Sequence, residues 1–429
     1  MVWVFFLSLL ISDVLAMPLT IAASSSAFSC SIDNITSIQR SAYNTQQQLQ
    51  INEHGCACFR NGDELRSGVR DFVRDGCADN NNCGNEVARK YGWPIGTWCV
   101  SAVTDMTELF YNKYYFNDDI SSWDVSSVTA MKGMFNRASS FNQDLSGWDV
   151  SSVTNMTSMF KGASSFNGDL SEWDVSSVRS MKEIFAGTTS FNGDLSSWDV
   201  SSVTTMYSMF GSDTHSVNGA RLFNQDLSTW NVSSVTDMSY MFSKASSFNQ
   251  DLSTWNVSSV TTMEFMFFDA SSFNSDLSFW DISFVTNLGF MFSGASSFNQ
   301  DLSSWDITSV EYMAGMFERA SSFNQGLSSW EVSAISDMDW MFKGASSFNG
   351  DLSSWDVSSV TSMKSMFSEA SSFYQDLSSW NVSLVRQMDR MFFRASSFNG
   401  DLSAWNVSAV SQMEYMFAGA SSFNQGLSA

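Results

Sequence analysis

The sequence predicts a repeat solenoid of leucine-rich-repeat type, in which each coil of 25 residues contributes a short parallel strand and a short helix. A small disulfide-bonded cap is predicted at the N-terminal end of this array. Two observations carry the prediction: tryptophan recurs every 25 residues over most of the chain, and all six cysteines fall in the first hundred residues. A fixed period of 20–50 residues is typical of arrays whose units bury their core only against their neighbours.

The first sixteen residues, MVWVFFLSLLISDVLA, predict a signal peptide over 1–16. An apolar-rich segment is followed by Val14-Leu15-Ala16, which offers a small residue for cleavage. No later run approaches the roughly 18 apolar residues that a membrane helix needs, so no transmembrane segment is predicted. The expected localisation is secreted or at the cell surface.

Residues 17–97 do not repeat and predict a cysteine-rich cap. An even number of cysteines in an exported chain favours up to three disulfides over a zinc site, because their gaps do not suit metal ligands. A short amphipathic helix is expected over 64–74. A disulfide from Cys99 back into this region would join the cap to the first coil. The cysteines are Cys30, Cys56, Cys58, Cys77, Cys83 and Cys99.

Residues 98–429 predict about thirteen copies of the repeat, with seven extra residues between Trp198 and Trp230. From Val128 the apolar offsets in one copy are 0, 3, 6, 7 and 10, which lie within an arc of about 120° on a helix. Ser126 and Ser127 could cap that helix, and residues 144–146 are expected to form the strand. Strands repeat at ~4.8 Å and helices at ~8–10 Å, so the array should curve with its strands inside. The recurring apolar residues of this copy are Trp123, Val125, Val128, Met131, Met134, Phe135, Ala138, Phe141 and Leu145.

The repeated text W-D-V-S-S-V-T-x-M-x-x-M-F-x-x-A-S-S-F-N-x-D-L resembles the BspA-like leucine-rich-repeat surface proteins. The resemblance covers residues 91–429, and residues 91–98 (YGWPIGTW) resemble the start of that family's repeats. It implies a cell-surface protein that works by adhesion or recognition. The chain departs from standard leucine-rich repeats in having Phe, Met and Trp where they have Leu.

The balance of charge excludes nucleic acid as a partner. Lys and Arg number 21 against 44 Asp and Glu, a net charge of −23, which repels polyanions and favours cations or basic partners. Two histidines, His54 and His215, lie outside any repeated pattern, and no catalytic motif is present. The prediction is a non-enzymatic protein that binds an extracellular protein or glycan. The alternative is a structural or mineral-associated protein of a wall or matrix.

An aromatic strip is the first candidate binding surface. The tenth residue after the tryptophan would face solvent on the predicted helix, and an apolar patch there would mark a partner surface. The alternative is that these rings pack between coils. The strip consists of Tyr240, Phe265, Phe268, Phe290 and Trp340.

An acidic column is the second candidate site. Bound calcium, the one cofactor that the sequence suggests, would relieve repulsion between carboxylates stacked at ~4.8 Å. The alternative is that each carboxylate accepts backbone N–H bonds in its own turn. The residue after the tryptophan alternates between Asp and Asn, so hydrogen bonding rather than charge is expected to matter there. The column comprises Asp119, Asp144, Asp169, Asp194, Asp226, Asp251, Asp276, Asp301, Asp351, Asp376 and Asp401.

Three further features are candidates. The insertion at 211–222 could form a recognition loop, and the last coil lacks a cap, which predicts either a truncated chain or end-to-end self-association. Asn-x-Ser/Thr sequons could carry glycans in a eukaryotic secretory pathway. They occur at Asn34, Asn155, Asn231, Asn256, Asn381 and Asn406.

Overall fold

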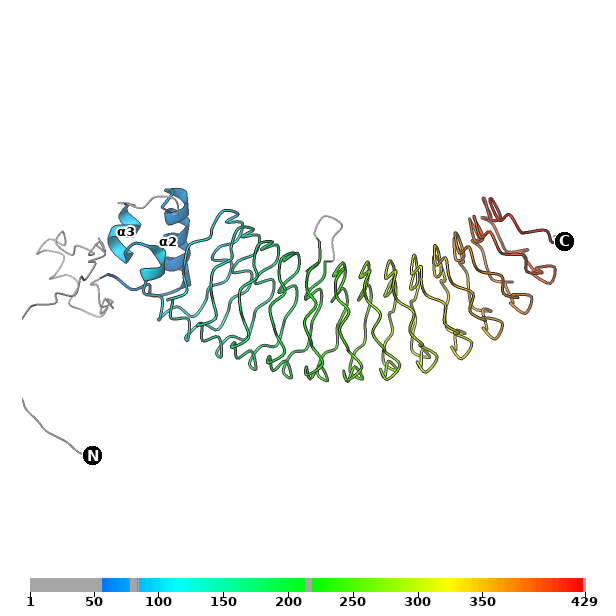
Figure 1. The fold of residues 1–429 in the computed structure, drawn as a ribbon, viewed down its shortest axis with the longest axis horizontal. Coiled ribbons are helices and arrows are strands. Elements are labelled where there is room, and N and C mark those ends of the chain that lie inside the picture. Colours follow the sequence, from blue (N-terminus) through cyan, green and yellow to red (C-terminus); the bar gives the residue numbers. More distant parts are fainter. Residues whose placement is uncertain (1–55, 78–82, 84, 213–217, 427–429) are drawn as a thin grey trace, which may run out of the picture.

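The computed structural model describes residues 56–77, 83, 85–212 and 218–426. The predicted signal peptide, Cys30, Asn34 and both histidines lie outside the described residues. Within the described ranges, the chain forms a small helical cap followed by a long curved array of coils (Figure 1). No described helix is long and apolar enough to cross a bilayer.

The cap contains α2 (Gly62–Arg74), α3 (Glu86–Tyr91) and the 3₁₀ helix η2 (Ile95–Thr97). The helix expected over 64–74 is therefore confirmed. Asn61 accepts the N–H of Glu64 at 3.0 Å and satisfies one of the free donors at the start of α2. The apolar face of α2 is buried in the cap through Leu65, Val69 and Phe72.

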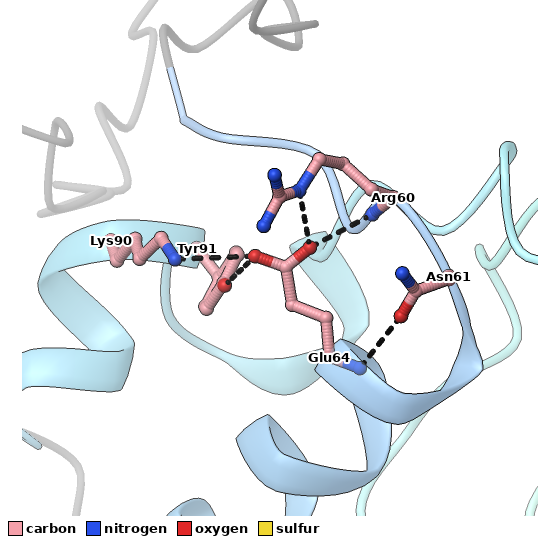
Figure 2. A network of polar contacts seen from close by, with 5 residues as sticks. All are labelled: Arg60, Asn61, Glu64, Lys90 and Tyr91. Atoms are coloured by element: carbon pink, nitrogen blue, oxygen red, sulfur yellow. Dashed lines mark hydrogen bonds and ion pairs between the residues drawn. The ribbon is translucent and has the colours of Figure 1, made fainter. Parts of the chain in front are cut away.

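Glu64 connects α2 to α3 through a group of polar contacts (Figure 2). Its carboxylate accepts Arg60 Nε at 3.0 Å, Tyr91 Oη at 2.7 Å and Lys90 Nζ at 3.2 Å. Burial raises the pKa of Glu64, but the hydrogen bonds from Arg60, Tyr91 and Lys90 outweigh it and lower the pKa to about 2. Burial and the bond to Glu64 raise the pKa of Tyr91. The carboxylate therefore stays ionised and holds the two helices together.

Cys58 and Cys99 form the disulfide that joins the cap to the first coil, with an S–S distance of 2.04 Å. The predicted link from Cys99 back into the cap is thus confirmed. Cys77 bonds Cys83 within the cap, and Cys56 is also disulfide-bonded. Disulfides of this kind persist in oxidising compartments.

The core of the array runs unbroken through the coils. We count positions within a coil from its tryptophan, which is position 0. In the copy beginning at Trp123, all nine recurring apolar residues are at most 3% exposed. The side chains that the repeat predicts as core therefore form the core.

The predicted helix in each coil is wrong, because positions 7–14 form a series of tight turns. The N–H of Met134 closes one turn on Met131 O at 3.1 Å, and that of Ala138 closes another on Phe135 O at 2.9 Å. Non-glycine residues at position 10 have a left-handed φ of 54–60°, which an α-helix does not contain. Turns and helices both return a side chain to the core after three or four residues, so the apolar spacing does not distinguish them.

The N–H groups that a helix would use internally donate to the next coil instead. In the coil of Trp123, the donors at positions 8, 10, 12 and 14 reach carbonyls of the following coil at 2.7–3.0 Å, as Gly133 does with Thr157. A left-handed residue costs roughly 1 kcal/mol. The backbone hydrogen bonds between successive coils, which form a ladder along the array, offset this cost because they leave few backbone donors unpaired.

The strand predicted at 144–146 is also wrong. Asp144 Oδ1 accepts the N–H of Ser146 at 2.9 Å and closes a turn there. Parallel pairing occurs instead as single bridges at position 7, for example between Ala130 and Asn155. Ser126, predicted to cap a helix, donates its N–H and hydroxyl to Asp124.

Side chains replace the backbone ladder on the other side of each coil. The indole N–H of Trp173 donates at 3.0 Å to the carbonyl of Leu145, which lies 28 residues earlier in the chain. Asn117 Oδ1 accepts the N–H of Asn142 at 2.8 Å, and this contact recurs along the array. The indole bonds satisfy buried donors where the coils stand further apart, and the exposed asparagine contacts link the same side of the coils at the surface.

The spacing between equivalent rings explains the curvature. For the coils of Trp230 and Trp255, the ring centroids are 4.8 Å apart at position 10, 5.7 Å at position 12, 6.2 Å at position 18 and 6.4 Å at position 0. The array therefore bends toward positions 7–14, which form the concave side of the arc in Figure 1. The sequence predicted a curved array with residues 144–146 and their equivalents on the inside. The array is curved, but the predicted sense is wrong: the interstrand-like hydrogen bonds lie at positions 7–14, where a helix was expected, and this side is concave.

Candidate functional site

The concave side, which we call the inner face, presents the side chains of positions 7, 9, 10, 13 and 14. The left-handed turns at positions 10 and 14 aim these side chains away from the core. After residue 99 the chain has fourteen Lys and Arg residues, and ten of them lie on the inner face. The other four are Lys113, Arg179, Arg221 and Arg386. The ten are Lys132, Arg137, Lys161, Lys182, Lys244, Arg319, Lys343, Lys364, Arg390 and Arg394. Sequence variation and basic charge are therefore concentrated on one side of the array.

An aromatic ladder runs along the middle of the inner face. Phe265 stacks on Tyr240 and on Phe290, each at 4.8 Å between centroids with planes 11° and 8° apart. Phe268 meets Phe265 edge-on at 5.4 Å. The rings are partly buried. The sequence left two alternatives, a solvent-facing strip and rings packed between coils, and the structure combines them, since the rings pack between coils and still reach the surface.

Two lysines lie at the ends of this ladder. Phe290 is followed by Gly315, where a Cβ would lie 2.2 Å from the Phe290 ring, and Trp340 continues the row at 6.2 Å. Lys364 lies 6.0 Å from the Trp340 ring. At the other end Lys182 lies 4.3 Å from the ring of Tyr207, which neighbours Tyr240. The ladder thus accommodates cations at both ends within the molecule itself.

Three carboxylates beside the ladder differ electrostatically from those elsewhere. Burial raises the pKa values of Glu264, Asp269 and Asp339. Lys244 and Arg319 act against this effect at Asp269. Carboxylates that are costly to leave charged gain most from a cationic or hydrogen-bonding ligand.

Five overlapping segments of the chain match one family model, described as "Mycoplasma protein of unknown function, DUF285". The matched residues are 83–185, 146–219, 167–277, 251–353 and 325–429. The chain belongs to this family. The array of coils is therefore a run of DUF285 repeats, while the narrower resemblance to BspA-like surface proteins stays a prediction.

No curated protein matches the chain. Among solved structures, one match is the "Crystal structure of TLR13-ssRNA13 complex", with 7% identity and a TM-score of 0.18. The match covers 74% of this chain and 56% of that one. At this TM-score the match carries no argument about the DUF285 repeats.

The acidic column lies on the convex side, or outer face, made of positions 19, 20, 21, 24 and 1. Each carboxylate accepts a backbone N–H two residues on, as Asp251 does from Ser253 at 2.8 Å. The backbone hydrogen bond lowers the pKa of Asp251, and the same bond acts on Asp144 and Asp301. In the described ranges, no group of three or more His, Cys, Asp or Glu side chains is placed to hold a metal. The hydrogen bonds of these turns give each carboxylate a structural role of its own, and calcium binding by the column stays a prediction.

The residue after the tryptophan follows the same rule. Asn231 Oδ1 accepts the N–H and the hydroxyl of Ser233 at 3.2 and 2.7 Å, as Asp124 does from Ser126 at 3.2 and 2.6 Å. The expectation that hydrogen bonding matters here more than charge is confirmed.

The sequons differ in accessibility. Those at position 1, which are Asn231, Asn256, Asn381 and Asn406, have exposed asparagines, so the neighbouring buried tryptophan does not enclose them. Asn155 is partly buried in the bridge column and accepts the N–H of Thr157.

The insertion at 211–222, in the coil that begins at Trp198, starts on the inner face. Ser212 O accepts the hydroxyl of Ser243 at 3.1 Å, and the backbone of Gly211 lies against Tyr240 O. Residues 213–217 lie outside the described part. The described ends of the insertion thus sit beside the first ring of the aromatic ladder.

The sequence prediction missed the full extent of the inner face. Tyr207 at position 9 and Tyr312 at position 7 also carry rings there, and Tyr312 packs over the backbone of Gly289. Aligning the copies and comparing every position from 7 to 14 would have found them, because these positions differ most between copies.

Proposed function

We propose that this DUF285 protein is a non-enzymatic, secreted or cell-surface protein that recognises an extracellular protein or glycan through its inner face. The supporting observation is the aromatic ladder beside the partly buried Glu264 and Asp269 and the buried Asp339, on the one side of the array where the copies differ. A surface that varies along a constant scaffold is the usual place for recognition. The disulfides support an extracellular setting.

The chemistry of the inner face favours a partner that carries apolar and basic groups. Tyr240, Phe265 and Phe290 offer a continuous apolar strip. Glu264, Asp269 and Asp339 would recover interaction energy with a cation near that strip. Partly exposed aromatic residues in a contiguous row are the type of side chain that dominates binding energy at interfaces.

The test compares the full chain with the triple variant Tyr240→Ser, Phe265→Ser and Phe290→Ser on a panel of secreted proteins and glycans. Ser already occupies position 10 at Ser158, Ser208 and Ser365, so the backbone accepts it. Saturable binding that the triple variant loses supports the proposal. Binding that survives in the triple variant, or no binding by the full chain, would contradict it.

A structural or mineral-associated role is the second candidate, and the outer face is the observation that favours it. Asp144, Asp251 and Asp301 are kept ionised in a regular row. Adsorption to calcium mineral that the triple variant retains, and that Asp→Asn substitutions in this row abolish, would support it.

A further inference from the structure

The outer face departs from its repeat where the coil of Trp230 meets the coil of Trp255. At position 20 most copies have glutamine, whose Nε2 donates to the position-19 carbonyl of the preceding coil, as Gln250 does to Asn224 O at 2.9 Å. Ser275 occupies this position in the next copy and is too short to make the bond. The carbonyl of Asn249 therefore lacks this donor, as do the equivalent carbonyls where Gly168, Gly193, Gly350 and Gly400 occupy position 20.

The second departure is four residues later. At position 24 most copies have Ser or Thr, whose hydroxyl donates to a carbonyl of the preceding coil, as Thr254 does to Ser228 O at 2.8 Å. Phe279 takes this position in the next copy. The carbonyl of Ser253 consequently loses its donor too, and the phenylalanine ring is 78% exposed.

Both carbonyl-bearing residues line the same depression, of about 390 Å³. Asp251 and Asp276 lie on it with one carboxylate each, and Phe279 forms part of its wall. Asp251 has a lowered pKa because it accepts the N–H of Ser253, so it is an acceptor at neutral pH. The depression therefore combines an exposed aromatic ring with several hydrogen-bond acceptors.

We propose that this depression binds one ring of a neutral saccharide. A pyranose has an apolar C–H face, which is attracted to the negative face of an aromatic ring such as Phe279. Its rim of hydroxyls would donate to the carbonyls of Asn249 and Ser253 and to the two carboxylates at ordinary hydrogen-bond distances. The volume is at the small end of ligand sites, as suits a single sugar ring.

The charge of the depression selects among ligands. Asp251 and Asp276 disfavour anionic sugars. A bare divalent cation would not use the ring of Phe279. The site lies on the outer face, away from the aromatic ladder, and is independent of the partner proposed for the inner face.

The chain supplies its own controls. Phe279→Ser and Ser275→Gln restore residues that other copies carry at these positions, so both variants should fold. Phe284 is 66% exposed in the coil that begins at Trp280 and does not line the depression, so Phe284→Ser is the matched control for losing an exposed ring.

The experiment titrates two neutral sugars, cellotriose and N,N′,N″-triacetylchitotriose, separately into the full chain and each variant, and saturation-transfer NMR follows the binding. We expect saturable millimolar binding of one of them, weakened about tenfold or more by Phe279→Ser and by Ser275→Gln and unchanged by Phe284→Ser. Binding that Phe279→Ser does not weaken, or none by either sugar, would overturn the proposal. So would a calcium ion that binds Asp251 and Asp276 and excludes the sugar. The inner-face triple variant should bind the sugar normally, which separates this result from the proposed function.

Discussion

Phe265 and Phe290 occupy the same position in successive coils and stack with their centroids 4.8 Å apart and their planes 8° from parallel. This distance equals the spacing of hydrogen-bonded strands. The backbone ladder of positions 7–14 therefore sets the ring spacing, and the rings in turn cover the ladder. The aromatic surface and the tightest part of the fold are the same feature.

The triple variant Tyr240→Ser, Phe265→Ser and Phe290→Ser should be less stable but folded. Two stacked pairs are lost, each worth about 0.5–1.5 kcal/mol, together with the contacts to Tyr207, Phe268 and Trp340. The free energy of unfolding should therefore fall by at least about 1–3 kcal/mol. Denaturant titration measures the loss, and circular dichroism should be unchanged. Collapse of the array would show instead that the rings are indispensable core.

Arg137→Gly should stabilise the chain. Arg137 has a φ of 61° at position 14, where later copies have Gly162 and Gly187. Removing the side chain relieves left-handed strain and should raise the free energy of unfolding by about 0.5–1 kcal/mol. The unfolding midpoint in urea measures the change.

Lys132→Gly is the control for this prediction. Lys132 is exposed in the same coil, carries the same charge and has no left-handed φ. The free energy of unfolding of the Lys132→Gly variant should fall by about 0.5–1 kcal/mol, because glycine here only adds conformational freedom to the unfolded chain. Equal effects of the two variants would contradict the strain argument.

Loss of the Cys58–Cys99 disulfide should loosen the cap and the first coil. The pair Cys58→Ser and Cys99→Ser opens a link across 41 residues, which costs about 2–4 kcal/mol. Hydrogen exchange should speed up across residues 58–110 and leave later coils unchanged, since each unit contacts only its neighbours. Cys77→Ser with Cys83→Ser, which opens a separation of only 6 residues, should have a smaller effect. Uniform acceleration along the array would refute this view of the cap.

Glu64→Gln should remove a pH-dependent part of the stability. Glu64 has its pKa lowered from 4.5 to about 2 in the folded chain. The stabilisation is therefore fully present above pH 4.5 and disappears as the pH falls through 2. At pH 7 the variant should be less stable by about 1–2 kcal/mol, after allowance for solvent screening. Urea midpoints between pH 7 and 2 should converge for the two proteins.

Asp63→Asn provides the comparison. The Asp63 side chain is 91% exposed and pairs with Arg66 at 2.7 Å. Such surface pairs contribute about 0–1 kcal/mol. If the effect of Asp63→Asn on the free energy of unfolding depended on pH as strongly as that of Glu64→Gln, the contacts of Glu64 would not be the source of the pH dependence.

The sequence by itself determined the repeat, its period and every core position, because a side chain that must be buried recurs wherever the coil returns to the core. It also predicted the cap, the α2 helix and the link through Cys99, from the end of the repeat and the confinement of the cysteines. The aromatic residues at position 10 were recognised because they differ from the residues that other copies of the repeat have at this position.

Only the tertiary structure decided what the backbone does between those core positions. An apolar spacing such as that of Val128, Met131 and Met134 shows which side chains point inward but not where the N–H groups donate. In this array they donate to the neighbouring coil at 2.6–3.2 Å, a partner that no single copy contains. The choice between helix and stacked turns, the inner and outer faces, and the depression that Ser275 and Phe279 form with Asn249 and Ser253 of the preceding coil all depend on contacts between coils.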